Sequence, residues 1–330
     1  MNESPTIYGI GNPLIDIIIL VNDDDINNLG LNKGAMKLVG LKKQNEIIQY
    51  FKDSKLKFCP GGSAPNTIIA CAGLGIPSMV SGKIGSDKFG DIYLEQVKKY
   101  GALSSLVQID GGNTGTSIIL VTPDGERTMA TNLGICRDYS IRDIDKDQLI
   151  QSTFLYFTGY MWDTLSQKEA VREAIDIAHE NKIIIAFDVA DPFVVQRNKI
   201  EFLDMIKSDI DIVFANKVEL SLLFGSDNTE KSINQLMEYI KYGGIKLGKK
   251  GSIVFEDYKK YVIKPNPVKS IDSTGAGDMY AAGFLSSLSI NDDYKLAGEL
   301  GVALAEEIIQ IQGAQFDKIV IDKLASKIFC

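Results

Sequence analysis

Strand-like and helix-like segments alternate along most of the chain, and this order constrains the fold more than any other feature of the sequence. Short apolar runs at residues 7–11, 182–189 and 211–216 are separated by longer amphipathic segments such as residues 167–181. Alternation of this kind is typical of a parallel sheet covered by helices. The sequence therefore predicts an α/β fold in three layers, with a doubly wound sheet flanked by helices.

Two regions break the alternation and have the pattern of extended pairs, in which neighbouring strand-like runs pair with each other. One holds the apolar runs LIDIIILV and AMKLVG, and the other turns back on itself at the segment PDGE. Because such hairpins cannot be crossover helices, we expect a small β-sheet lid formed by about residues 14–41 and 112–133. The chain contains no internal repeat or linker, so residues 1–330 are predicted to form one domain.

The composition is that of an ordinary globular protein without a basic surface. Of the 330 residues 45% are apolar and 24% are charged, and 35 basic residues face 43 acidic ones, for a net charge of −8. No block of Lys and Arg is long enough to neutralise a phosphate backbone, so no nucleic-acid partner is expected. No run approaches the roughly 18 apolar residues of a membrane span, and the N-terminus lacks the order of a signal peptide, so no membrane association is expected.

The cysteine and histidine content excludes several kinds of site. The four cysteines lie far apart and form no CxxC pair, so neither a zinc site nor a disulfide framework is indicated, and a cytoplasmic location is expected. The single histidine, His179, excludes a Ser-His-Asp triad and a multi-histidine metal site. We interpret His179 as a solvated residue near a helix end.

Two glycine-containing segments approach nucleotide-binding motifs without satisfying them. Residues 243–250, GGIKLGKK, match the first part of the P-loop pattern, but Lys250 stands where a hydroxyl residue is needed and a strand-like segment follows. Gly9 and Gly11 have the spacing of a dinucleotide fingerprint, but Leu14 occupies the place of its third glycine. Neither a P-loop nor a dinucleotide site is predicted.

The segment DSTGAGD, residues 272–278, carries the strongest chemical signal. Gly275 and Gly277 precede an apolar stretch with helical character, where converging backbone N–H groups and the helix dipole favour an anion. Asp278 falls in the first turn beside that anion, where a carboxylate is useful if it accepts the proton of an attacking hydroxyl group. The alternative is an ordinary helix start, because acidic residues are common there.

A second glycine-rich helix start, residues 60–75, has the same design. Pro65 fixes the backbone for the start of a helix, and Asn66 falls in its first turn. One helix start can bind a phosphoryl donor, while the other lets a polyhydroxy substrate approach the backbone with Asn66 beside its hydroxyl groups. Here too, an ordinary turn-to-helix junction is the alternative.

The segments GGSAPN and DSTGAGDMYAAGFL together resemble the two signature regions of the ribokinase-like (PfkB) family of carbohydrate and nucleoside kinases. Further segments, among them GNPLID, IGSDKFGDI, DIVFANKVE and IIQIQGAQF, resemble the adenosine kinases of that family and extend over nearly the whole chain. The resemblance implies a ribokinase-like fold with a small β-sheet lid. It also implies transfer of a phosphoryl group from ATP, with Mg²⁺, to a hydroxyl group of a small molecule.

The resemblance assigns roles to the residues around the transferred group. In the family, an aspartate at the position of Asp278 takes the proton from the acceptor hydroxyl. The backbone amides of Gly275, Ala276 and Gly277 hold the γ-phosphoryl group during transfer. These implied roles agree with the interpretation of DSTGAGD from its residues alone.

The implied donor site lies further from the reacting atoms. Asn216 and Glu219 match the family's N-x-x-E element, which organises Mg²⁺ and its waters around the nucleotide phosphates. The same spacing also fits a capping box at a helix N-terminus, which is the alternative. Gly248 and Gly251 align with the loop that cradles the donor nucleotide.

The implied ribose site draws on both glycine-rich regions. The family's counterpart of Asp16 binds two sugar hydroxyl groups, Gly61, Gly62 and Asn66 complete the ribose site, and Asn12 lies near the base. Without the resemblance, Asp16 could equally be a charge that protects an edge strand from aggregation.

The implied base site and lid involve fewer residues. Leu14 and Tyr160 fall where the family sandwiches adenine, although Tyr160 could be a core tyrosine and Trp162 could share its role. Arg127 resembles the lid arginine that reaches the phosphates after closure, with a solvated hairpin charge as the alternative.

Met36 and Pro65 depart from the adenosine kinases, which carry polar residues at these positions, so the nucleobase stays open. The prediction is a kinase that phosphorylates the 5′-hydroxyl of a ribonucleoside, with adenosine, converted to AMP as in purine salvage, as the first candidate. The alternatives are a sugar, inosine or guanosine kinase of the same family and a non-catalytic nucleotide-binding protein with this fold. We expect a monomer or homodimer.

Overall fold

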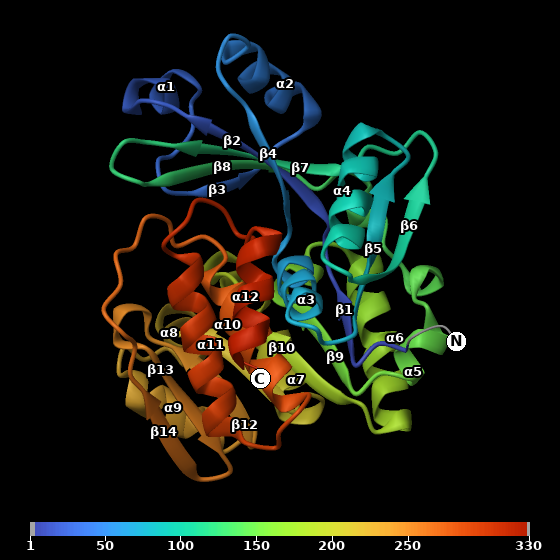
Figure 1. Ribbon diagram of the computed structural model, residues 1–330, viewed down its shortest axis with the longest axis vertical. Helices are drawn as coiled ribbons and strands as arrows, with labels where there is room; N and C mark the ends of the chain where they lie inside the picture. The colour runs from blue at the N-terminus through green and yellow to red at the C-terminus, as the bar shows by residue number, and fades with distance from the viewer. Residues whose placement is uncertain (1–3, 329–330) are drawn as a thin grey trace.

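A nine-stranded sheet forms the centre of the protein, in a computed structural model that describes residues 4–328 (Figure 1). Its strands follow the order β14-β13-β12-β11-β10-β9-β1-β5-β6, with β13 and β14 antiparallel to their neighbours and the other pairs parallel. The strand bounds are Ile7–Ile10 (β1), Ser78–Gly85 (β5), Leu103–Ile109 (β6), Phe154–Thr158 (β9), Ile184–Asp188 (β10), Ile212–Asn216 (β11), Tyr242–Lys246 (β12), Ser252–Glu256 (β13) and Lys259–Ile263 (β14). The predicted parallel sheet is confirmed.

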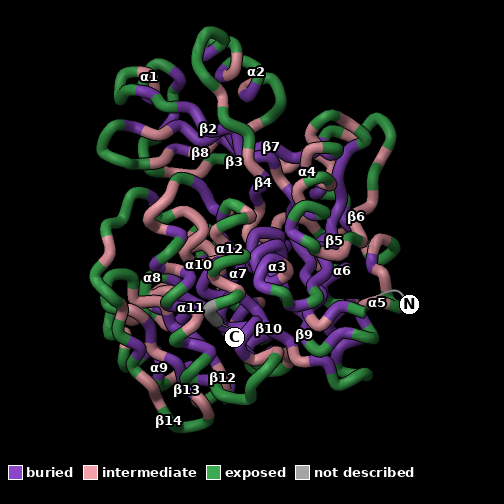
Figure 2. The backbone as a smooth tube through the Cα atoms, in the orientation of Figure 1, coloured by how far each residue is buried: buried purple, intermediate pink, exposed green. Residues whose placement is uncertain are grey.

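Helices cover both faces of this sheet and bury two separate apolar cores. Along β9, Phe154 and Tyr156 point into one core, while Leu155 and Phe157 point into the other, because successive strand residues face opposite sides. Figure 2 shows the buried chain running through the strands and the helices beside them. The layered architecture predicted from the sequence is therefore present.

The two faces are covered by different groups of helices. On the first face α3 packs on β1 and β5, α10 packs between α3 and α11, and α12 lies against α3. On the second face α6 packs on β9 and β10, and α7, α8 and α9 follow one another. The helix bounds are Ser63–Gly73 (α3), Lys88–Lys99 (α4), Lys146–Ile150 (α5), Leu165–Asn181 (α6), Pro192–Ser208 (α7), Lys217–Phe224 (α8), Thr229–Met237 (α9), Ala276–Leu288 (α10), Tyr294–Ile308 (α11) and Lys318–Ile328 (α12).

A second, five-stranded sheet lies beside the main one, in the order β3-β8-β7-β2-β4 (Figure 1). Its elements are Leu14–Leu20 (β2), Met36–Leu38 (β3), Lys57–Gly61 (β4), Gly115–Val121 (β7) and Arg127–Asn132 (β8), with Asp23–Asn28 (α1) and Leu41–Tyr50 (α2) between them. The hairpin expected at PDGE is confirmed, since β7 and β8 pair antiparallel.

The structure corrects the sequence interpretation of this small sheet in two respects. The runs LIDIIILV and AMKLVG do not pair with each other: β2 pairs with β4 and β7, and β3 pairs with β8. The sheet also takes in β4, which lies outside the stretches 14–41 and 112–133. The strand KFCPG has exposed residues on an edge and a proline, so its sequence lacks the alternating apolar pattern that reveals a half-buried strand.

The chain crosses between the two sheets at points that the sequence motifs occupy. The segment GNP, residues 11–13, joins β1 of the main sheet to β2 of the small sheet. Gly61 and Gly62 lead from β4 of the small sheet into α3 of the main body. Residues of GNP and of the first glycine-rich signature region therefore border the space between the sheets. Among residues 4–328, no helix is both long enough and apolar enough to cross a membrane.

Gln44 fastens α2 to the small sheet. Its buried amide donates to the carbonyl oxygens of Thr116, at 2.9 Å, and Ala130, at 3.0 Å, and accepts from the Thr116 hydroxyl at 2.7 Å. We expect Gln44→Leu to lower the free energy of unfolding by about 2 kcal/mol, because it leaves buried polar partners unsatisfied. Urea denaturation measures this loss. Gln49→Leu, at an exposed position of the same helix, is the control, and equal losses in the two variants would contradict the role of Gln44.

Candidate active site

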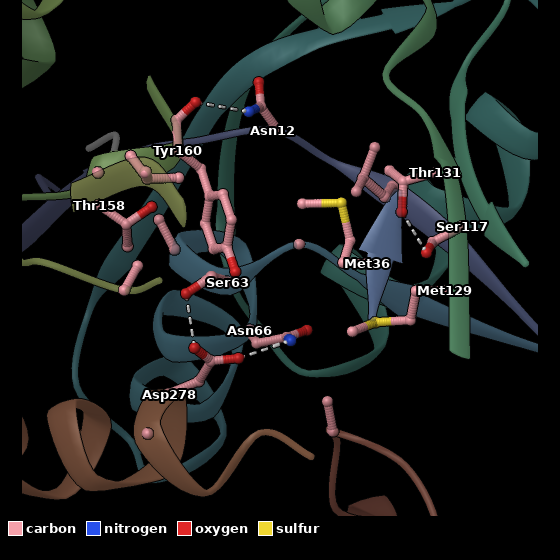
Figure 3. Close-up of a pocket in the computed structure, with 18 of the residues that line it drawn as sticks. Asn12, Met36, Ser63, Asn66, Ser117, Met129, Thr131, Thr158, Tyr160 and Asp278 are labelled. Carbon is pink, nitrogen blue, oxygen red and sulfur yellow. Dashed lines mark hydrogen bonds between the residues drawn. The ribbon is translucent and has the colours of Figure 1, made fainter. Parts of the chain in front are cut away.

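A cavity of about 470 Å³ lies between the small sheet and the carboxyl ends of the main strands (Figure 3). Ligand sites of open α/β sheets lie at this edge of the sheet. Twelve of the residues predicted from the sequence line it: Asn12, Leu14, Asp16, Gly62, Asn66, Tyr160, Asn216, Glu219, Gly248, Gly275, Gly277 and Asp278.

The N-terminus of α10 forms the anion-binding part of the cavity. Gly275 caps the helix with φ 75°, and a Cβ atom there would lie 2.7 Å from the Cα of Ala314, so only glycine fits both the conformation and the space. The amides that follow are the unpaired N–H groups of the first helical turn. This geometry favours an oxyanion, as the sequence indicated.

Asp278 lies in the first turn of α10 and is held by two side chains of α3 (Figure 3). The Ser63 hydroxyl donates to Oδ1 at 2.6 Å, and the Asn66 amide donates to Oδ2 at 2.9 Å. Burial raises the pKa of Asp278 to about 6, and the hydrogen bonds from Ser63 and Asn66 oppose that rise. The carboxylate is therefore buried and held in one orientation, and its pKa lies near neutral pH. These are properties that suit a general base.

The N-terminus of α3 is shaped by two consecutive glycines. Gly62 has φ 98°, and a Cβ atom there would lie 2.0 Å from the carbonyl oxygen of Asn12. A Cβ atom on Gly61 would lie 2.5 Å from Oδ1 of Asp16, so this glycine leaves room for the Asp16 carboxylate rather than lining the cavity itself. Both positions require the absence of a side chain.

Asp16 projects from β2 into the cavity and is almost fully buried. Burial raises the pKa of Asp16 to about 7, the Arg127 guanidinium opposes the rise, and Asp278 adds to it. No hydrogen-bond donor of residues 4–328 contacts the Asp16 carboxylate. A buried carboxylate facing a cavity without a donor is well suited to bind the hydroxyl groups of a ligand.

Asn216 and Glu219 form the capping box of α8 that was the sequence alternative. Glu219 accepts from the Asn216 backbone at 2.7 Å and from its amide at 2.6 Å, while Asn216 accepts from the backbone of Val218 and Glu219. Both residues nevertheless line the cavity, and burial raises the pKa of Glu219 above its ordinary value. Asn216 and Glu219 therefore cap α8 and at the same time line the candidate site.

Magnesium is held in phosphotransferase sites by one or two carboxylates together with waters and substrate phosphates. Among residues 4–328 no group of three or more His, Cys, Asp or Glu side chains is arranged for a metal ion. Glu219 supplies a single buried carboxylate at the cavity wall, with Asn216 beside it. These residues fit a magnesium ion bound mainly through water and nucleotide.

Lys246 is a cavity residue that sequence reasoning missed. It ends β12, and its ammonium donates to Oδ2 of Asp188 at 2.7 Å. Burial alone would lower the pKa of Lys246, but the carboxylates of Asp188 and Glu219 outweigh burial and raise it. The signal lay inside GGIKLGKK, the segment that fails the P-loop pattern, because Lys246 follows the buried part of a strand.

One part of the cavity is lined by one aromatic and two sulfur-containing side chains. Tyr160 stands on one side, and Met36 and Met129 stand opposite (Figure 3). Asn12 lies near Tyr160, and its amide oxygen accepts from Gln167 at 2.7 Å. Trp162 does not share this wall, since it is buried among Phe157 and Phe202 in the second core.

Three other predicted residues do not line the cavity. Arg127 forms an ion pair with Asp272, which also accepts from the backbone of Thr274 and Gly313, so the small sheet is tied to the loop before α10. Gly251 lies in the turn between β12 and β13. Ala276 contributes its backbone to the first turn of α10.

Ser63, like Lys246, was not predicted from the sequence, because its role depends on a contact between distant segments.

Comparison with known proteins identifies the family of the chain. The model of the pfkB family carbohydrate kinases matches residues 36–320. The structure of adenosine kinase from Sinorhizobium meliloti superposes with a TM-score of 0.92 at 31% identity, covering 98% of this chain and 99% of that one. In sequence, an adenosine kinase of Schizosaccharomyces pombe is 26% identical over 339 residues, covering 94% of this chain and 96% of that protein.

A carbohydrate kinase is among the relatives as well. A 5-dehydro-2-deoxygluconokinase of Clostridium perfringens is 27% identical over 281 residues, covering 80% of this chain and 82% of that protein. Fold and site together define a phosphotransferase with an alcohol group as acceptor. The chain belongs to the pfkB family of carbohydrate kinases, as the resemblance of its two glycine-rich segments implied.

The hydrogen bond from Ser63 gives a prediction about Asp278. We expect Ser63→Ala to raise the pKa of Asp278, because the lost hydroxyl favours the charged form, and to move its titration midpoint upward by about one pH unit. A carboxyl ¹³C NMR titration of protein labelled at aspartate measures the midpoint. Ser63→Thr keeps the hydroxyl and is the control. A midpoint that is unchanged in Ser63→Ala would contradict the contact.

Proposed function

We propose that this enzyme transfers the γ-phosphoryl group of ATP to the 5′-hydroxyl of a ribonucleoside, with adenosine as the first candidate. The observation that carries the proposal is the position of Asp278 in the first turn of α10, beside the helix N-terminus and inside the cavity. A base and an anion-binding site on one turn suit the transfer of a phosphoryl group to a hydroxyl.

Asp278 is the proposed base of this reaction. As the bond forms between the acceptor oxygen and the γ-phosphorus, the bond from that phosphorus to the bridging oxygen breaks, and its electron pair leaves with ADP. The proton of the acceptor hydroxyl passes to the Asp278 carboxylate. The amides of Gly275, Ala276 and Gly277 and the dipole of α10 stabilise the negative charge on the transferring group.

The donor is proposed to lie between α10 and the β12–β13 turn. Gly248 and Gly251 would accommodate the nucleotide, and Asn216 and Glu219 would hold Mg²⁺ through waters. Magnesium, when bound, supplies positive charge that offsets the charge of the phosphates. In support, Gly248, Asn216 and Glu219 line the same cavity as Asp278.

The acceptor is proposed to bind against the small sheet. Asp16 would accept hydrogen bonds from two ribose hydroxyls, with Gly61, Gly62 and Asn66 at its side. The cavity is also lined by the aromatic side chain of Tyr160, and this is evidence for a substrate that carries a base in addition to its sugar. Leu14 is proposed to contact the base together with Tyr160, and Asn12 to lie at its edge.

The likeness to adenosine kinases over more than nine-tenths of the chain favours adenosine. A sugar is the second candidate, because the Clostridium perfringens relative is a 5-dehydro-2-deoxygluconokinase. Arg127 is proposed to stabilise the closed position of the small sheet near the phosphates, since its partner Asp272 immediately precedes the anion-binding turn. We also propose a cytoplasmic location, because Cys59, Cys71 and Cys136 are free thiols.

A coupled assay of ADP release tests the proposal with adenosine, inosine, guanosine, ribose and fructose 6-phosphate as acceptors. We expect the highest kcat/KM with adenosine. Asp278→Asn should lower kcat by about 10²- to 10⁴-fold while ATP affinity changes by only several-fold. Preference for a free sugar would replace the nucleoside proposal with a sugar kinase, and near-normal turnover of Asp278→Asn would overturn the assignment of the base.

Tyr160 decides between a nucleoside and a bare sugar. If its ring stacks on the base, Tyr160→Ala should raise KM for adenosine by about 5- to 150-fold with a smaller change in kcat, because the stack exists in ground and transition states alike. Turnover of ribose should hardly change. Tyr258→Ala, at a side chain that is 87% exposed, is the control. An unchanged ratio of kcat/KM for adenosine over ribose would identify Tyr160 as a packing residue.

A further inference from the structure

The ammonium of Lys246 lies beside the anion-binding turn of α10. A Cβ atom built on Gly277 would lie 3.2 Å from Nζ of Lys246. Lys246 also lines the cavity with Asn216, its register partner across β11 and β12, and with Asp278. Lys246 is therefore a cation placed where the helix N-terminus already favours an anion. Arg197, which also lines the cavity, is paired with Asp163.

The bonding of Lys246 leaves donors free for a ligand. An ammonium group carries three N–H donors. One is used by Asp188, and no second acceptor of residues 4–328 bonds to Nζ. Asp188 is almost fully buried at the end of β10, and its other oxygen accepts from the backbone of Ala190 at 3.0 Å. Asp188 thus fixes the direction of the Lys246 side chain but uses only one of the three N–H donors of its ammonium.

Acidic side chains outnumber basic ones in the lining of the cavity, where Arg197 is paired with Asp163 and Lys246 is the other cation. Asp16, Glu219 and Asp278 all line the cavity, and Asp188 lies directly behind Lys246. Each of these carboxylates repels a polyphosphate. The attraction of the helix dipole and of magnesium for the phosphates is therefore opposed by the negative charge of the cavity. A lysine ammonium in a partly buried site offsets that negative charge at the point nearest the α10 amides.

We propose that the Lys246 ammonium is a catalytic residue that contacts the transferring phosphoryl group at the N-terminus of α10, and that Asp188 is the residue that positions it. This rests on the proposed function, in which the γ-phosphoryl of the donor lies at that turn. In this proposal Lys246 binds the oxygens of the γ-phosphoryl group, which ADP lacks. Its effect should therefore depend on the presence of the third phosphate.

The test compares two ligands by isothermal titration calorimetry with Mg²⁺: the β,γ-methylene analogue of ATP, and ADP. Lys246→Met should weaken binding of the analogue by about 10- to 100-fold and change ADP binding by less than about threefold, since a hydrogen bond from a charged donor is lost only with the triphosphate. The same variant should lower kcat by about 10²-fold or more, with KM for the acceptor nearly constant.

Further variants separate this role from a structural one. Lys246→Met leaves the buried Asp188 carboxylate without its cationic partner. Lys246→Met combined with Asp188→Asn removes both charges and relieves that penalty. We expect the double variant to recover the melting temperature but not the preference for the triphosphate. Lys246→Arg should keep part of that preference. Lys98→Met, at an exposed position of α4, is the control for loss of one positive charge.

The outcomes distinguish the two proposals. An unchanged ratio of analogue to ADP affinity in a folded Lys246 variant would overturn the role of Lys246 and leave the kinase proposal in place. Recovery of that ratio in the double variant would identify the pair as purely structural and would also overturn the role. Failure of the wild-type protein to bind either nucleotide would instead overturn ATP as the donor.

Discussion

The contact between the two glycine-rich helices at Asp278 is the constraint on which the site depends. Ser63 and Asn66 of α3 hold the carboxylate of a residue in the first turn of α10, and the Thr67 hydroxyl donates to the carbonyl oxygen of the same residue at 3.1 Å. Side chains more than 200 positions apart in sequence therefore fix one another. Because α3 and α10 also pack along their length, the two signature segments meet in a single orientation.

This contact joins the functions of the two signature segments. The α10 turn presents backbone N–H groups to an anion, and α3 begins at the glycine pair that borders Asp16. Burial raises the pKa of both Asp16 and Asp278, yet only Asp278 has donors that favour its charged form. The two buried carboxylates of one cavity therefore differ in their surroundings, and this difference underlies the separate roles proposed for them, hydroxyl binding for Asp16 and proton transfer for Asp278.

Local patterns in the sequence were sufficient for the main sheet, the β7–β8 hairpin and most of the residues that line the cavity. Alternating segments predicted the parallel strands, and glycine before an apolar run predicted the starts of α3 and α10, because these signals are contained in a few neighbouring residues. The residues Ser63, Asp188 and Lys246 were not found, since their roles come from contacts between separate elements. Strand β4 was missed because its exposed first residues, its proline and its glycine give no alternating apolar pattern.

The position of β1 in the sheet has a consequence for the order in which the protein can be assembled during synthesis. This strand, near the N-terminus, lies between β5 and β9 and pairs in parallel with both. Parallel pairings between distant segments form slowly, because a long loop must close before any contact is made. One edge of β1 therefore stays unpaired until β9 has been synthesised, and an unpaired strand edge of this kind is open to pairing with another chain.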